Sequence, residues 1–194
     1  MPEKTQKAAA NGRKEIQMAG IGGQGLALAG VILAEAAGIH EGKHVATIEV
    51  HGVNARGGPS RSDIIVSDEE IDYPAVRRPD ILIAMTPRDV QTYGPSVRDD
   101  GIMVIDTTRV GFVPASKAKV IAIPLAKSAR ELGQELVVGI MALGVVSALT
   151  GAVSLEALEQ AVAERVPAKV LDLNRKALET GARLAREAAE KGAQ

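Results

Sequence analysis

The chain has 194 residues, of which 46% are hydrophobic, and this length suits one well-buried core better than two ordinary domains. The formal net charge is -1 and only 2% of the residues are aromatic, so nucleic-acid binding is disfavoured. The chain contains no cysteine, which excludes disulfides, thiolate nucleophiles and iron–sulfur clusters bound by this chain. Any electron-transfer centre must therefore lie in a partner.

The sequence shows neither a signal-peptide core nor about 18 consecutive apolar residues, the length that a membrane span needs. We therefore expect no membrane association and a cytoplasmic location. Residues 1–13 are small and polar and are predicted to be a disordered tail. Residues 14–191 are predicted to form a single α/β domain.

Short apolar or β-branched segments that end at turn residues predict strands at 14–19, 44–50, 61–66, 80–85, 102–106 and 119–123. An apolar helix is expected at 24–39, directly after the first strand. The chain becomes helical towards its end, with helices expected at 136–149, from Ser154 to Pro167, and at 169–191. Strands that alternate with helical stretches predict a three-layer Rossmann-like sandwich, with a mostly parallel sheet and a helical C-terminal part.

A glycine-rich turn connects the first strand to the first helix, and it fits the pattern of glycines that can surround a bound phosphate. Glycine allows a tight turn, and a helix N-terminus offers free N–H groups and a partial positive charge to an anion. The alternative is that glycine only permits close packing of strand and helix. The candidate binding residues in this turn are Gly20, Gly22, Gly23, Gln24 and Gly25.

Glu49, near the end of the second strand, is where a nicotinamide dehydrogenase would place an acidic residue for the ribose hydroxyls. It lies somewhat late for that role, and no His or Tyr acid/base with a carboxylate follows it. An ordinary strand-end carboxylate is an equal interpretation of Glu49.

Further candidates lie in loops. Arg56, Gly57 and Gly58 form a shaped loop in which a guanidinium could reach an anionic ligand or a partner carboxylate, or could simply be solvated. Thr107 follows a buried strand at the edge where α/β proteins collect ligands, although it could equally begin an ordinary connection.

The histidines form no metal-ligand set with nearby acids. The apolar run 136–149 is the best candidate for subunit contact if it is not core.

These features together resemble the gamma subunit of the 2-oxoacid:ferredoxin oxidoreductases, over about residues 14–185. The residues that carry the resemblance are Gly20-Ile21-Gly22-Gly23-Gln24-Gly25, Leu33–Ala37, Arg56-Gly57-Gly58, Pro79–Met85, Gly101–Asp106, Asn174, Ala177 and Gly181. Residues 49–52 look like the indolepyruvate members, whereas Pro79–Met85 look like the 2-oxoglutarate and branched-chain types. The resemblance therefore leaves the 2-oxoacid open.

The resemblance implies a complex of alpha, beta and ferredoxin-like delta subunits that bind thiamine diphosphate, Mg²⁺ and 4Fe–4S clusters. The complex would oxidatively decarboxylate a 2-oxoacid to acyl-coenzyme A and reduce ferredoxin, which this chain would meet only indirectly. The chain itself would be a docking scaffold without catalytic residues, inactive alone, that could contact coenzyme A. Isolated copies could pair as a homodimer.

Two other functions remain open from the sequence. One is an independent NAD(P)-binding reductase, which the glycine turn and Glu49 would support. The other is a pure assembly module whose glycine turn binds no ligand.

Overall fold

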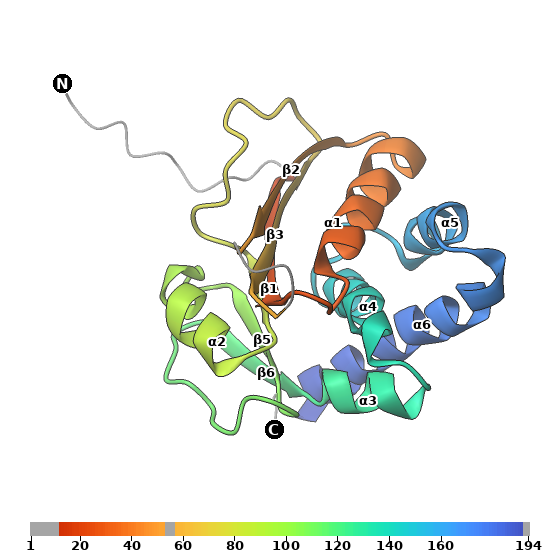
Figure 1. Ribbon diagram of the computed structural model, residues 1–194. Coiled ribbons are helices and arrows are strands. Elements are labelled where there is room, and N and C mark those ends of the chain that lie inside the picture. The colour runs from red at the N-terminus through yellow and green to blue at the C-terminus, as the bar shows by residue number, and fades with distance from the viewer. Residues whose placement is uncertain (1–11, 53–56, 192–194) are drawn as a thin grey trace.

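The computed structural model describes residues 12–52 and 57–191, and it places a six-stranded sheet between two unequal layers of helices (Figure 1). The strands are β1 (Lys14–Ile21), β2 (His44–His51), β3 (Pro59–Ser67), β4 (Ile81–Ala84), β5 (Ile102–Asp106) and β6 (Lys119–Ile123). The helices are α1 (Leu26–Glu35), α2 (Pro87–Tyr93), α3 (Leu125–Glu131), α4 (Val138–Thr150), α5 (Leu155–Arg165) and α6 (Ala168–Lys191). Short helical turns are η1 (Ala36–His40), η2 (Gly94–Ser96) and η3 (Glu135–Val137).

The strand order is β2-β3-β1-β4-β5-β6, and β1, β4, β5 and β6 run parallel to one another. Strand β3 is antiparallel to both of its neighbours, β1 and β2. The predicted Rossmann-like sandwich with a mostly parallel sheet is confirmed. The insertion of β3 between β1 and β2 is the departure from a fully parallel order.

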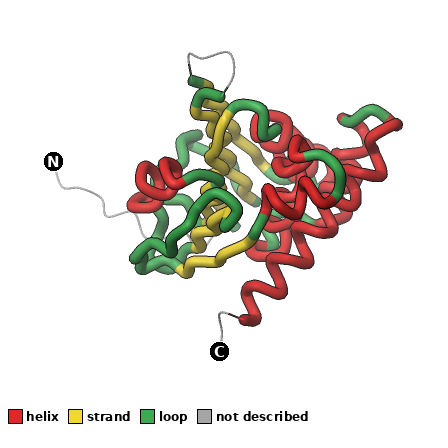
Figure 2. Tube along the Cα trace, turned by 60° about the horizontal axis from the view of Figure 1, so that its bottom comes forward, coloured by secondary structure: helices red, strands yellow, loops and turns green. Residues whose placement is uncertain are grey.

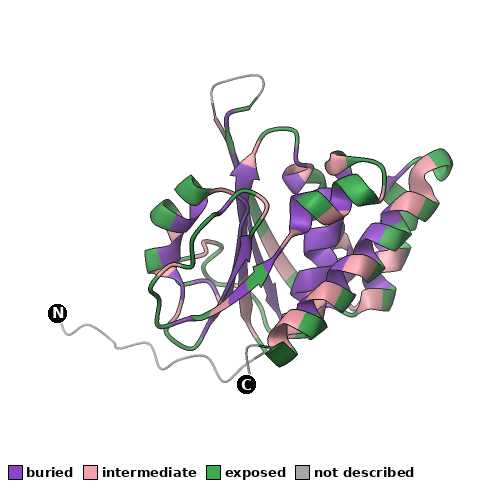
Figure 3. Cartoon of the chain, turned by 90° about the horizontal axis from the view of Figure 1, so that it is seen from below, coloured by how far each residue is buried: buried purple, intermediate pink, exposed green. Residues whose placement is uncertain are grey.

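The two faces of the sheet differ in how much helix covers them (Figures 1 and 2). Among the described helices, α2 and the short turn η2 lie on one face, which we call the α2 face, where Val90 packs with Leu82 of β4 and Met103 of β5. The remaining helices lie on the other face, the helical face, where Ile16 and Met18 of β1 point into the larger core. Figure 3 shows buried residues concentrated between the sheet and these helices.

Helix α4 is the centre of the helical layer, because α6 lies across it. Gly144 of α4 and Gly181 of α6 sit at the crossing, where a Cβ on either glycine would collide with a backbone carbonyl of the opposite helix. Residues 137–146 are buried, so the expectation of a buried helix at 136–149 is confirmed. The alternative prediction, that residues 136–149 contact another subunit, is wrong for these buried residues, since α6 already covers them. Leu136, before α4, is 60% exposed.

Candidate functional site

The connections that follow β1 and β4 cross opposite faces of the sheet. Helix α1 follows β1 over the helical face and leads to β2, whereas α2 follows β4 over the α2 face and leads to β5. The ends of β1 and β4 lie side by side, since the Met85 N–H donates to the Ala19 carbonyl at 3.0 Å. In open α/β sheets, ligands bind at the carboxyl edge where the strand order reverses in this way. The glycine turn lies at this point.

The glycine turn has a conformation that only glycine adopts readily at two positions. Gly23 has φ 100° and Gly25 has φ 72°, both in the left-handed region. The Gly22 N–H donates to the Gly58 carbonyl at 2.7 Å, which ties the turn to the loop between β2 and β3. Gly22 and Gly23 themselves are exposed, so the turn presents bare backbone to the solvent.

The side chain of Gln24 folds back into the turn. Its Oε1 accepts a hydrogen bond from the Ile21 N–H at 2.8 Å, and the residue is only 3% exposed. Because Oε1 accepts from a backbone N–H, Nε2 is fixed as the free end of the amide. Nε2 is buried and has no hydrogen-bond partner among the described residues. Gln24 therefore stabilises the turn and leaves one donor unused.

The first turn of α4 packs directly on the backbone of the glycine turn. A Cβ on Gly139 would lie 2.7 Å from the Gly25 oxygen and 2.9 Å from the Gln24 oxygen. A Cβ on Gly25 would lie 3.1 Å from the Leu136 oxygen. The turn is therefore fixed from behind by α4, while Gly22 and Gly23 remain exposed.

The open side of the turn is electrostatically suited to an anion. Gly25 is the N-cap of α1, and neither a capping side chain nor an acidic residue occupies the first turn of this helix. The N–H groups there keep the partial positive charge of a helix N-terminus. A phosphate or carboxylate could bind to these amides without displacing a protein side chain.

The described end of the loop between β2 and β3, Gly57 and Gly58, lies against the glycine turn. A Cβ on Gly22 would lie 3.6 Å from both the Gly57 nitrogen and the Gly58 oxygen, which is ordinary van der Waals contact. The structure therefore brings Gly57 and Gly58 to the glycine turn. Arg56 lies outside the described residues, and its role stays a prediction.

Thr107 lies at the same edge of the sheet, with β4 between its strand and β1. Its side chain is exposed and its N–H donates to the Ile123 carbonyl at 3.0 Å. Its neighbours have structural roles: buried Asp106 accepts from the Ala126 N–H, and Thr108 Oγ1 accepts from the Lys127 N–H, so both cap α3. Thr107 is left as the group at this strand end that could face a ligand.

Glu135 links the Thr107 loop to the rear of the glycine turn. It forms ion pairs with Arg109 and with Arg130, the latter at 2.9 Å, and Leu136 next to it contacts Gly25. The hydrogen bond from Arg109 and then that from Arg130 lower the pKa of Glu135. One carboxylate between two guanidinium groups leaves this cluster with one net positive charge, and the two ion pairs hold the loops together.

Glu49 does not lie beside the glycine turn. It is on β2, which β3 separates from β1, and its carboxyl group points onto the helical face, where it contacts Ser62 and Gly30. Burial raises the pKa of Glu49, and its Oε2 has no hydrogen-bond partner in the described ranges. This placement favours an ordinary strand carboxylate over a ribose ligand.

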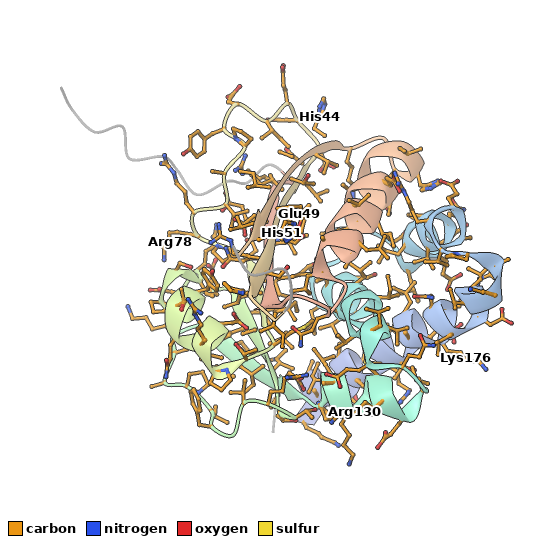
Figure 4. The ribbon with its side chains drawn as sticks, viewed as in Figure 1. His44, Glu49, His51, Arg78, Arg130 and Lys176 are labelled. Atoms are coloured by element: carbon orange, nitrogen blue, oxygen red, sulfur yellow. The ribbon has the colours of Figure 1, made fainter. Side chains whose placement is uncertain are left out.

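The remaining polar candidates do not form a metal site in the part of the chain that the structure describes, where no group of three or more His, Asp or Glu side chains could hold an ion. His44 and His51 lie exposed at the two ends of β2 (Figure 4), and His40 lies 3.6 Å from Glu164 of α5. Across residues 12–52 and 57–191, no helix has the length and apolar character that crossing a membrane requires.

Sequence reasoning missed Thr86, which occupies the second position after β4 at the same edge of the sheet. Its Oγ1 accepts from the Asp89 N–H and caps α2, and the two side chains share a 2.6 Å hydrogen bond. The signal was present, because Thr-Pro-Arg-Asp is a helix start with a capping residue and proline in the first turn. Gly139 was also missed, and its contact with the turn carries no sequence signal.

Comparison with known proteins agrees with this architecture. The family model for pyruvate ferredoxin/flavodoxin oxidoreductase matches residues 15–184. The chain is 36% identical over 182 residues to 2-oxoglutarate synthase subunit KorC of Methanothermobacter thermautotrophicus, covering 90% of this chain and 96% of that protein. It is 33% identical over 167 residues to pyruvate synthase subunit PorC of Methanothermobacter marburgensis, covering 84% and 92%.

A solved structure extends the agreement to three dimensions. The gamma subunit of a keto/oxoacid ferredoxin oxidoreductase from Geobacter sulfurreducens superimposes with a TM-score of 0.80 at 40% identity, covering 90% of this chain and 99% of that one. The chain belongs to the pyruvate ferredoxin/flavodoxin oxidoreductase family, as one of its gamma-type subunits.

Proposed function

We propose that the chain is the gamma subunit of a thiamine-diphosphate-dependent 2-oxoacid:ferredoxin oxidoreductase, and that its glycine turn forms one wall of the coenzyme A approach. The alpha, beta and ferredoxin-like delta subunits would hold thiamine diphosphate, Mg²⁺ and the iron–sulfur clusters. The absence of cysteine from this chain supports that division, since such clusters are held mainly by cysteine thiolates. The relatives act on different 2-oxoacids, so the proposal does not choose one.

The observation that carries the proposal is the open side of the glycine turn at the switch point of the sheet. The exposed backbone at Gly23 and the free N-terminus of α1 offer N–H groups that can donate hydrogen bonds. Coenzyme A carries phosphates and amide carbonyls, which accept them. Thr107 and the loop at Gly57 and Gly58 would line the same approach.

The test is Gly22→Ala in the assembled enzyme. Gly22 has no positive φ, and a Cβ there meets only atoms at 3.6 Å or more, so the chain should fold normally. A methyl group would nevertheless separate a phosphate from the backbone. We expect KM for coenzyme A to rise about tenfold or more, equivalent to about 1.4 kcal/mol of lost binding, with kcat at saturating coenzyme A nearly unchanged.

The matched control is Gly111→Ala, since Gly111 is exposed and has no positive φ, and a Cβ there would meet no described atom within 4 Å. An unchanged KM in Gly22→Ala, with normal assembly, would contradict a coenzyme A contact. If Gly22→Ala instead lowered the yield of the complex and left KM unchanged, the turn would be a pure assembly element.

The NAD(P)-binding alternative has a separate test, isothermal titration of the isolated chain with NADH and NADPH. The position of Glu49, separated from β1 by β3, argues against a ribose contact, so we expect no binding heat. Binding in the micromolar range would favour the reductase instead.

A further inference from the structure

Strand β2 is an edge of the sheet, and its outer side has no strand partner in the described part of the chain. On its inner side all eight residues, His44–His51, pair with β3 in an unbroken register. Alternate N–H and C=O groups of a strand point to each side, so the backbone groups on the outer side of β2 pair with no other strand of the described chain.

This edge lacks the features that usually prevent strands from pairing between molecules. Such features are lysine, proline, a bulge or a very short strand. Strand β2 reads His-Val-Ala-Thr-Ile-Glu-Val-His, and the carboxyl group of its single acidic residue, Glu49, is bonded to Ser62 of the neighbouring strand. Neither lysine nor proline occurs in it. It is a long edge strand, rich in β-branched residues.

The opposite edge of the same sheet is protected in the usual way. Strand β6 has five residues, begins at Lys119 and is followed directly by Pro124. The contrast between two edges of one sheet indicates that the open edge at β2 is a specific feature.

The α2 face beside β2 is also incompletely covered. Ile48 and Val50 are 39% and 40% exposed, and they lie opposite Asp63 and Arg61 of β3 in the register. Arg61 pairs with Asp63 at 2.9 Å, but its Nε is buried without a partner among the described residues. Gln17 of β1 donates to Asp63, and its own Oε1 is likewise buried without a described partner.

The free edge is continuous with the candidate site. In the register, His51 lies opposite Ser60, which in turn lies opposite Gly20 at the start of the glycine turn. His44 and His51 mark the two ends of β2 in Figure 4. A strand that paired along β2 would therefore end separated by two strands from the start of the glycine turn.

We propose that β2 accepts an extended segment of another subunit of the oxidoreductase, which adds a strand to the sheet. This inference rests on the proposed function, which makes the chain one part of a multisubunit enzyme. The segment carries apolar residues at alternate positions, which pack beside Ile48 and Val50, and polar residues between them on the side of Thr47 and Glu49. Main-chain hydrogen bonds hold it, and alternate side chains give specificity.

The test is a double variant, Ile48→Lys with Val50→Lys, in the full chain. A tag on this chain is used to purify the oxidoreductase from its own host. Ala122→Lys is the matched control, because Ala122 is an exposed residue of β6 on the protected edge. We expect the control to recover the complex at the wild-type yield, and the double variant to recover at least about tenfold less while its circular dichroism stays that of a folded chain.

Hydrogen–deuterium exchange of the wild-type protein gives a second readout that does not depend on variants folding. The amides of β2 should exchange at least about tenfold more slowly in the complex than in the isolated chain, with β6 as the internal reference. Equal exchange of β2 in the two states, or full recovery of the complex with a folded double variant, would overturn the inference and leave the proposed function standing.

Three further results would also overturn it. If the isolated wild-type chain sediments as a dimer that the double variant dissociates, the occupant of β2 is a second copy of this chain. If β2 is protected in the isolated chain until residues 1–12 are removed, the occupant is the N-terminal segment of the same chain. If the wild-type chain recovers no other subunit, both the inference and the proposed function fail.

Discussion

Gly139→Ala tests whether α4 fixes the glycine turn. The new Cβ would lie 2.7 Å from the Gly25 oxygen and 2.9 Å from the Gln24 oxygen, and both are backbone atoms that no rotamer change can move. Overpacking of this kind costs about 1–3 kcal/mol, and the better helix propensity of alanine recovers up to about 1 kcal/mol. We expect a net loss of about 1–2 kcal/mol in the free energy of unfolding.

The measurement is urea denaturation of the full chain, followed by circular dichroism. For a chain of this size the expected loss corresponds to a fall in Tm of about 2–8 °C. Gly38→Ala is the control, because Gly38 is also helical but a Cβ there meets its nearest atom at 3.6 Å. It should leave the free energy of unfolding unchanged or raise it by up to about 1 kcal/mol, because alanine has the better helix propensity and no clash opposes it. A Gly139→Ala chain as stable as the wild type would refute the proposed packing.

Two other stability predictions follow from the same core. Gly181→Ala should lower the free energy of unfolding by about 2 kcal/mol or more, because its Cβ would collide with the Met141 carbonyl of α4, and urea denaturation beside the Gly38→Ala control would show this. Glu49 has a raised pKa because it is buried, so its contribution to stability is present below the ordinary pKa of 4.5 and is lost as pH rises through the higher folded-state value. The stability of Glu49→Gln relative to wild type should therefore increase from about pH 4 to about pH 8, and a constant difference between the two urea midpoints would contradict this.

The strands could be predicted from the sequence because their apolar runs are continuous and end at glycine, proline or acidic residues. Residues 81–84 and 102–106 are covered on both faces, and burial of this kind leaves an uninterrupted apolar pattern. The glycine turn was predictable for a different reason, since positive φ at Gly23 and Gly25 restricts those positions to glycine.

The short helices and the strand order were not predictable in the same way. Helices α2 and α3 have only seven residues each, too few for a helical period to stand out. The position of β3 between β1 and β2 depends on long-range pairing, and local sequence does not encode it. This strand order also decides the position of Glu49, which would lie beside the glycine turn if β2 paired directly with β1.

The most direct test of a coenzyme A approach at the glycine turn is hydrogen–deuterium exchange of the assembled oxidoreductase with and without coenzyme A. Gly23 is exposed and the first turn of α1 has no capping side chain, so coenzyme A should slow the exchange of the amides there. We predict protection across residues 20–28 and at Gly57 and Gly58, with no change in β6. Saturating coenzyme A without any change in exchange at residues 20–28 would contradict the proposal.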